Sequence, residues 1–199
     1  MEIKPYAESC DQNRDAIFNV LQPLLTHSSA VLEIGSGTGQ HAVYFSEKSP
    51  HIVWHTSDQA ENIEGIKLWV SEIETERLRQ PVELDVTQAI WPDISFDTVF
   101  TANTCHIMDQ RSVEIMLKRV GELLPKEGQL IIYGPFNYNR QYTSSSNEQF
   151  DQWLKSRDPE SCIKNFEDLN ELAEKTGMRL INDYEMPANN RILHWRKLK

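Results

Sequence analysis

The chain has 199 residues and a formal net charge of −10, from 30 Asp and Glu against 20 Lys and Arg. That length fits one domain and can bury a hydrophobic core without disulfides or metals. The acidic balance disfavours a nucleic-acid partner, because phosphate backbones repel such a surface, and no apolar run approaches the ~20 residues of a membrane span.

Three cysteines, Cys10, Cys105 and Cys162, are odd in number and widely spaced. This pattern is typical of reduced thiols and not of a disulfide framework or a zinc site, so we expect no bound metal. The N-terminus lacks a basic segment followed by an apolar run. We therefore expect no secretory signal and a cytoplasmic protein.

The C-terminal residues carry the only concentration of basic side chains: Arg191, Arg196, Lys197 and Lys199. They form either a basic patch or a solvated terminal strand and tail, and the second interpretation is the commoner one for a short charge run.

In the first half of the chain, apolar periodicity predicts a helix from about residue 10 to 27 and then a short apolar strand at 30–34. A glycine-rich turn joins this strand to the next helix. The following predicted elements are, in order, a helix over 40–48, a strand over 51–56, a helix over 60–77, a weak strand over 81–84 and a strand over 96–101.

The second half begins with a strongly periodic helix over 110–124, whose apolar stripe is Val113, Met116, Leu117, Val120, Leu123 and Leu124. A strand over 129–133 and a polar, aromatic loop follow. Ser146 begins a capping-box pattern before a helix that carries Phe150, Trp153 and Leu154. Asn165 can cap a further helix, and two strands over 178–185 and 191–196 form an antiparallel pair.

The alternation of strands and helices predicts an α/β protein. Its mostly parallel, seven-stranded sheet carries helices on both faces and an antiparallel edge strand. We expect a single domain, residues 1–199. It comprises an N-terminal helical segment (1–29), a cofactor-binding core (30–133) and a substrate-side part with loop, helices and the final strand pair (134–199).

The most informative stretch is the turn at 35–39, where Gly35, Ser36, Gly37 and Gly39 join a strand to a helix. Glycines there allow a tight turn and let a ligand approach the backbone and the helix N-terminus. A dinucleotide-binding turn needs its third glycine one position later, where Gln40 stands. Asp58, after the second strand, can accept hydrogen bonds from a ribose diol or can cap the next helix.

With Glu33 two positions before Gly35, the E-x-G-x-G-x-G arrangement resembles motif I of class I methyltransferases. The resemblance implies a Rossmann-like fold and bound S-adenosylmethionine, with Glu33 near the methionine moiety and the glycines packed against the cofactor. It also implies that Asp85 meets the adenine amino group and that Val86 flanks the ring.

Two further segments follow strands, where ligands bind in open α/β sheets. Asn103 and His106 come after the fourth strand, and we expect Asn103 to contact the cofactor. His106 can act as a general base, because imidazole titrates near neutral pH, or it can merely pack against the cofactor. Tyr133 ends the fifth strand, and we expect Tyr133 or His106 to lie by the transferred methyl group.

The wider pattern is similar to domain-of-unknown-function family 938, also called the methyltransferase-like 26 group. It includes the segments 32–42, 133–136, 143–147, 150–151 and 186–190. Asn13 and Arg14 also resemble a family motif. Arg14 can pair with a carboxylate of cofactor or acceptor, or can be an exposed helix residue. Asn137, Ser146 and Asn189 are further candidates for acceptor binding, although residues 186–190 can equally be a plain hairpin.

These observations predict S-adenosylmethionine-dependent methyl transfer to an acceptor that the sequence does not identify. The acidic balance and short chain favour a small molecule. Two alternatives stay open: a nicotinamide-dependent oxidoreductase, and a methyltransferase-like domain that binds a partner without catalysis. Nothing in the sequence indicates the oligomeric state.

Overall fold

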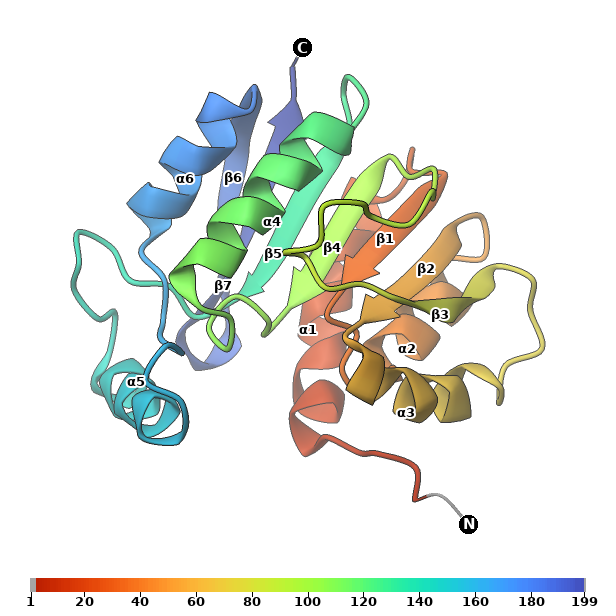
Figure 1. Cartoon of the computed structure of the whole chain (residues 1–199), viewed down its shortest axis with the longest axis horizontal. Helices are drawn as coiled ribbons and strands as arrows, with labels where there is room; N and C mark the ends of the chain where they lie inside the picture. Colours follow the sequence, from red (N-terminus) through yellow and green to blue (C-terminus); the bar gives the residue numbers. More distant parts are fainter. Residues whose placement is uncertain (1–2, 199) are drawn as a thin grey trace. The chain divides into compact units, whose positions relative to one another are not determined.

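The structure, a computed structural model, describes residues 3–198 (Figure 1). Seven strands form one sheet in the order β3-β2-β1-β4-β5-β7-β6, which confirms the predicted seven-stranded sheet. The chain divides into two compact units, residues 1–100 and 101–199, and each is described by itself. The prediction of a single domain stays a prediction.

In the first unit, β1 (Ala30–Ile34), β2 (Val53–Asp58), β3 (Leu78–Glu83) and the first residues of β4 (Thr98–Ala102) pair in parallel. Strand β1 lies between β2 and β4, so the chain moves outward from β1 to β3 and then returns. Four of the five β1 residues are buried, as expected for an interior parallel strand. Helices α1 (Glu8–Leu24), α2 (Gln40–Lys48) and α3 (Ala60–Val70) complete the unit.

Helix α3 is shorter than predicted, since it ends at Val70 and not near Arg77. Beyond Val70 the segment 71–77 is polar except for Ile73 and has no apolar face to bury. Strand β3 correspondingly starts at Leu78 and not at Pro81. Pro81 is tolerated there because β3 is an edge strand, which does not need every N–H for pairing.

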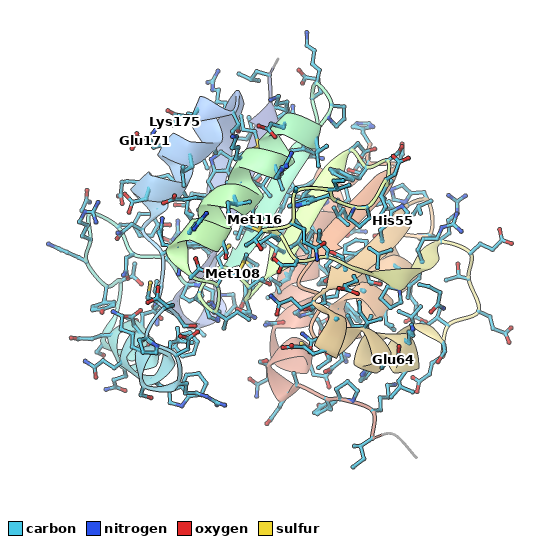
Figure 2. All side chains as sticks on the ribbon, viewed as in Figure 1. His55, Glu64, Met108, Met116, Glu171 and Lys175 are labelled. Carbon is cyan, nitrogen blue, oxygen red and sulfur yellow. The ribbon has the colours of Figure 1, made fainter. Side chains whose placement is uncertain are left out.

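In the second unit, β7 (Asn190–Lys197) pairs antiparallel with both β5 (Gln129–Gly134) and β6 (Met178–Met186). The predicted antiparallel pair is therefore confirmed, with β6 at the edge. Helices α4 (Gln110–Leu123) and α6 (Phe166–Lys175) lie side by side in Figure 1. Figure 2 labels Met116, which is buried, and Glu171 and Lys175, which form an ion pair at 2.6 Å on the outer side of α6.

Helix α5 (Ser145–Arg157) begins two residues earlier than the predicted capping box, because Ser144 and not Ser146 accepts the capping hydrogen bond from Asn147 N–H. Trp153 is 50% exposed. Its ring stacks on Phe150 and lies under the Arg157 guanidinium and not in the core. At the end of α4, Leu123 is exposed because Leu124 takes the last buried place of the stripe.

At α6, Asn165 occupies the predicted N-cap position but makes no capping hydrogen bond. Its amide instead donates to Asp168.

The basic residues near the C-terminus are largely compensated by neighbours in the second unit. Arg191 pairs with Asp183 at 2.7 Å and with Glu185 at 3.2 Å. Lys197 Nζ donates to backbone carbonyls at Gly121 and Thr176. This favours a terminal strand over a basic patch; Lys199 lies outside the described residues.

Cys10, Cys105 and Cys162 are free thiols. Among residues 3–198, no helix combines the length and the apolar character needed to span a bilayer.

Candidate functional site

The glycine turn follows β1 and has a backbone that ordinary residues rarely adopt. Gly35, Gly37 and Gly39 all have positive φ, at 71°, 59° and 92°. The N–H groups of Gly35 and Ser36 both donate to the Ser57 carbonyl at 3.0 Å, which ties the turn to β2. A side chain at Gly39 would also meet Trp69 Cβ at 3.2 Å, so this glycine allows α2 to pack against α3.

Glu33 is a buried carboxylate within β1, with 1% of its surface exposed. Ser36 Oγ and Trp54 Nε1 both donate to its Oε2 at 3.0 Å. Burial raises the pKa of the Glu33 carboxyl to about 7, with a smaller upward contribution from the Asp58 charge, although the hydrogen bonds from Trp54 and Ser36 oppose the shift. Carboxyl groups whose pKa is raised by burial are typical of binding and catalytic sites.

Asp58, at the end of β2, holds the glycine turn in place. Its Oδ2 accepts from Gly37 N–H at 2.7 Å, and its Oδ1 accepts from Gln59 N–H and Asn62 Nδ2, both at 2.8 Å. The residue at the N-cap of α3 is Gln59, so Asp58 is not the cap of that helix. A carboxylate has about four acceptor positions, which leaves capacity for a ligand hydroxyl.

Asp85 and Val86 follow β3. Asp85 Oδ1 accepts from both the N–H and the hydroxyl of Thr87, at 2.8 and 2.7 Å. Both bonds use the same oxygen, so Oδ2 is the acceptor through which Asp85 would meet an amino group. Val86 is buried, and its carbonyl accepts from Trp91 Nε1. The geometry is compatible with the predicted adenine contacts, which stay a prediction.

The start of α2 contains polar residues to which the sequence analysis gave no role. Gln40 Oε1 accepts from Ala7 N–H at 2.7 Å and from Thr38 Oγ1 at 3.0 Å. Gln40 is 3% exposed, and its Nε2 is buried without a hydrogen-bond partner among the described residues. The sequence feature that could have drawn attention to Gln40 is its position: it is a polar residue at the start of a helix, directly after the last glycine of the turn.

The next residue, His41, contacts Asn13 of the Asn13-Arg14 pattern. His41 Nε2 lies 2.7 Å from Asn13 Oδ1, and burial lowers the pKa of His41 to about 4. Arg14 pairs with Asp11 at 2.6 Å, and its guanidinium lies 4.8 Å from the centre of the Tyr44 ring. The structure therefore gives Arg14 partners within its own unit, and its proposed carboxylate ligand stays a prediction.

In the second unit, His106 is buried beside the end of β5. A side-chain carbon at Gly134 would lie 3.8 Å from His106 Nδ1, and the Phe150 ring meets the imidazole edge-on at 5.1 Å. Burial, with a smaller contribution from the Lys164 charge, lowers the pKa of His106 to about 4. The imidazole is therefore neutral at pH 7 and able to accept a proton.

Asn103 follows β4 with a left-handed backbone, φ 58°. Its N–H donates to the Tyr133 carbonyl at 2.9 Å, which joins the carboxyl ends of β4 and β5. Tyr133 is buried. The structure thus brings the segments of Asn103 and Tyr133 together at the carboxyl ends of these strands, where ligands bind in open α/β sheets. Their roles toward the cofactor and the methyl group stay predictions.

Two of the candidate acceptor residues meet in a second cluster of the same unit. Asn189 Nδ2 donates to Ser146 Oγ at 3.2 Å, and Asn147 Nδ2 donates to the Asn189 carbonyl at 3.2 Å. Asn137 takes part in other contacts: its N–H donates to the Lys164 carbonyl, and its carbonyl accepts from Phe166 N–H. Arg14 belongs to the first unit.

A family model described as "Protein of unknown function (DUF938)" matches residues 4–197. The chain also resembles solved methyltransferases. The apo form of the S-adenosylmethionine-dependent methyltransferase SibL is 17% identical with a TM-score of 0.80, over 96% of this chain and 56% of that one. Human N-acetylserotonin methyltransferase in complex with SAM is 14% identical with a TM-score of 0.81, over 96% of this chain and 53% of that one.

A third neighbour is an O-methyltransferase family 2 protein from Planctomyces limnophilus in complex with apigenin. It is 16% identical with a TM-score of 0.79, over 94% of this chain and 56% of that one. The chain thus spans little more than half the length of these structures. At such identities the likeness establishes the fold, which is the Rossmann-like fold of class I methyltransferases, as predicted.

Proposed function

Since the chain belongs to the DUF938 family and is a class I methyltransferase-like protein, we propose that it transfers a methyl group from S-adenosylmethionine to a small-molecule acceptor. The sulfonium of that cofactor supplies the reactive methyl group when bound. The protein's part is to hold the cofactor, orient the acceptor and exclude water.

The observation that carries the proposal is the pair of acidic side chains at the glycine turn, Glu33 and Asp58. Both are buried, and Asp58 already accepts the Gly37 N–H at 2.7 Å. A dinucleotide-binding turn offers such N–H groups to a pyrophosphate. Here a carboxylate takes one of them, so that N–H is not available to a pyrophosphate, and the carboxylates suit a ligand that brings an amino group and a ribose diol.

The donor set fits this cofactor. Asp58 and Asp85 provide carboxylate acceptors after β2 and β3, and Glu33 provides one within β1. Among the described residues, the buried donor Gln40 Nε2 has no hydrogen-bond partner. We assign Glu33, Gly35, Ser36, Gly37, Gly39, Asp58, Asp85, Val86 and Asn103 to cofactor binding.

For the acceptor we assign the second unit's His106 and Tyr133 to the reacting group. A neutral imidazole can accept a hydroxyl proton; with a pKa of about 4, His106 is neutral at pH 7 but is a weaker base than an ordinary histidine. If His106 is the base, His106→Gln will lower turnover by about 100-fold or more. If it only packs, turnover will change little.

Calorimetric titration of the purified protein tests the proposal. We expect S-adenosylmethionine and S-adenosylhomocysteine to bind, and NAD and NADP not to bind. Asp58→Ala should weaken binding strongly. Asn62→Ala is the matched control, because it removes one partner of the same carboxylate but leaves the carboxylate itself.

Well-folded wild-type protein that binds neither adenosyl ligand would refute the proposal, and NAD binding would favour an oxidoreductase. Cofactor binding without label transfer to any small-molecule pool would favour the partner-binding alternative. The transfer is measured with S-adenosylmethionine carrying a labelled methyl group.

A further inference from the structure

The Gln40 side chain is fixed in an orientation that leaves a donor without an acceptor. Its Oε1 accepts from Ala7 N–H at 2.7 Å. A backbone N–H can only donate, so the amide cannot be turned the other way, and Nε2 is the atom left without a partner among residues 3–198. Buried polar groups are nearly always satisfied in native proteins, which makes such an atom a candidate ligand contact.

The segment that supplies the Ala7 N–H is itself anchored. Trp69 Nε1 donates to the Pro5 carbonyl at 2.6 Å, and the Lys4 ammonium lies 3.3 Å from the centre of the Trp69 ring. Gly65 of α3 makes room for this segment, since a side chain there would meet Pro5 Cγ at 2.8 Å. The orientation of Gln40 is therefore held from α3 through residues 4–7.

The surroundings of Nε2 indicate an anionic ligand group. Gln40 is the first residue of α2, a helix of nine residues whose N-terminal end attracts negative charge. The same amide contacts Thr38 of the glycine turn through Oε1. The unmet group is a donor, so its partner must be an acceptor, and a carboxylate satisfies both requirements.

We propose that Gln40 Nε2 binds the carboxylate of the amino-acid end of the adenosyl cofactor and that the N-terminal segment 4–7 positions it. This rests on the proposed function and adds the group that distinguishes a cofactor with an intact amino acid from one without its carboxylate. Gln40 is thus a specificity-determining residue, with Ala7 and Trp69 as positioning residues.

The test is a cycle of two proteins and two ligands, measured by calorimetry. The ligands are S-adenosylhomocysteine and its decarboxylated analogue, which keeps the amine. The proteins are the wild type and Gln40→Met, which has a similar volume without the amide. We expect wild type to bind S-adenosylhomocysteine about 10- to 100-fold more tightly than the analogue, as for a hydrogen bond to a charged group, and Gln40→Met to lose most of that preference.

Thr38→Val is the matched control, because it removes the other hydrogen bond to Oε1 and leaves Nε2 in place; its preference for the carboxylate should persist. Equal binding of both ligands by the wild type overturns the inference, and this arm does not depend on the folding of any variant. A Gln40→Met protein that weakens both ligands equally overturns it too. Both results leave the proposed function intact, whereas a wild type that binds neither ligand refutes both.

Discussion

Two polar clusters, one in each unit, differ in how completely their side chains are hydrogen-bonded within the protein. Near the glycine turn, burial raises the pKa of Glu33, and Gln40 Nε2 is a buried donor with no partner in the part of the chain that the structure describes. At the start of α5, Ser146, Asn147 and Asn189 bond to one another. Those bonds hold the β6–β7 turn, where Ala188 and Asn189 have φ of 55° and 57°.

The difference separates two uses of polar residues. The first cluster contains buried polar groups that are not fully hydrogen-bonded, and this lowers the stability of the protein without ligand. A ligand that pairs with these groups restores that stability when it binds. The side chains of the second cluster form hydrogen bonds within the cluster, and these bonds offset the strain of a left-handed turn. We therefore expect changes in the first cluster to alter cofactor binding, and changes in the second to alter stability without altering cofactor binding.

The largest effect is expected for Gly39→Ala. The alanine would have to adopt a backbone φ of 92°, and its Cβ would lie 3.2 Å from Trp69 Cβ and 3.3 Å from Ile66 Cγ2. Left-handed strain of about 1–2 kcal/mol adds to about 1–3 kcal/mol for overpacking. Urea unfolding should show a loss in that combined range, and calorimetry should show loss of S-adenosylhomocysteine binding.

Gly37→Ala is the matched control for this substitution. Gly37 also has positive φ, at 59°, but no atom of residues 3–198 lies within 4 Å of the side-chain carbon that would be added. Only the strain of about 1–2 kcal/mol should appear. If both variants lose the same amount of unfolding free energy, the close approach of Gly39 to α3 does not contribute to the effect of Gly39→Ala on stability.

The second prediction concerns pH and Glu33. The folded protein holds the Glu33 proton up to about pH 7, against 4.5 for an ordinary carboxyl, so it binds more protons than the unfolded chain in that window. The free energy of unfolding therefore falls as pH rises from about 4.5 to about 7, by about 3 kcal/mol from this group. Glu33→Gln should remove that decline.

Buried His41, His106 and His194 have lowered pKa values and act in the opposite sense, because they favour the folded state as pH rises. The quantity to measure is thus the difference between Glu33→Gln and wild type in urea unfolding at pH 4.5, 6 and 8. A difference that stays constant across this range would mean that Glu33 ionises normally in the folded protein.

The sequence could predict what depends on local pattern. Strand β1, helix α2 and the glycine turn follow from apolar runs and glycine spacing, and the structure has both elements at the predicted bounds. The end of α3 at Val70 could not be predicted from the sequence, because the charged residues that follow are also common in helices. The helix ends there because Leu78 begins β3, and this depends on strand pairing in the sheet.

At the site, Glu33 and Asp58 were visible because acidic residues around a glycine turn stand out. Gln40 was not, since its meaning depends on Ala7, a residue 33 positions away that turns its amide. The capping role of Ser144 was missed for a similar reason: several serines in a row fit the same pattern, and only the backbone selects one.

The third prediction tests the second cluster through Asn147→Ala. Asn147 is buried and donates to Thr143 Oγ1 and to the Asn189 carbonyl. Its loss should cost about 1–2 kcal/mol in urea unfolding, with S-adenosylhomocysteine affinity unchanged. Ser146→Ala, at an exposed hydroxyl of the same cluster, should stay within about 0.5 kcal/mol. A cofactor-binding defect in Asn147→Ala would contradict the separation of the two clusters.

The smallest effect, and the one whose sign is most informative, is expected for Ala188→Gly. At φ 55° an alanine carries strain that glycine does not, of order 1–3 kcal/mol. The greater freedom of glycine in the unfolded chain offsets about 0.4–1 kcal/mol of the gain. The variant should therefore be more stable than wild type, by about 1 kcal/mol or less if the strain is at the low end.

Ala173→Gly makes the same chemical change inside α6, at a buried helical position, and should destabilise by about 1 kcal/mol or more. Opposite signs in urea unfolding would locate the strain in the β6–β7 turn and explain why Asn147 is buried to hold it. Destabilisation by both substitutions would mean that the turn is unstrained.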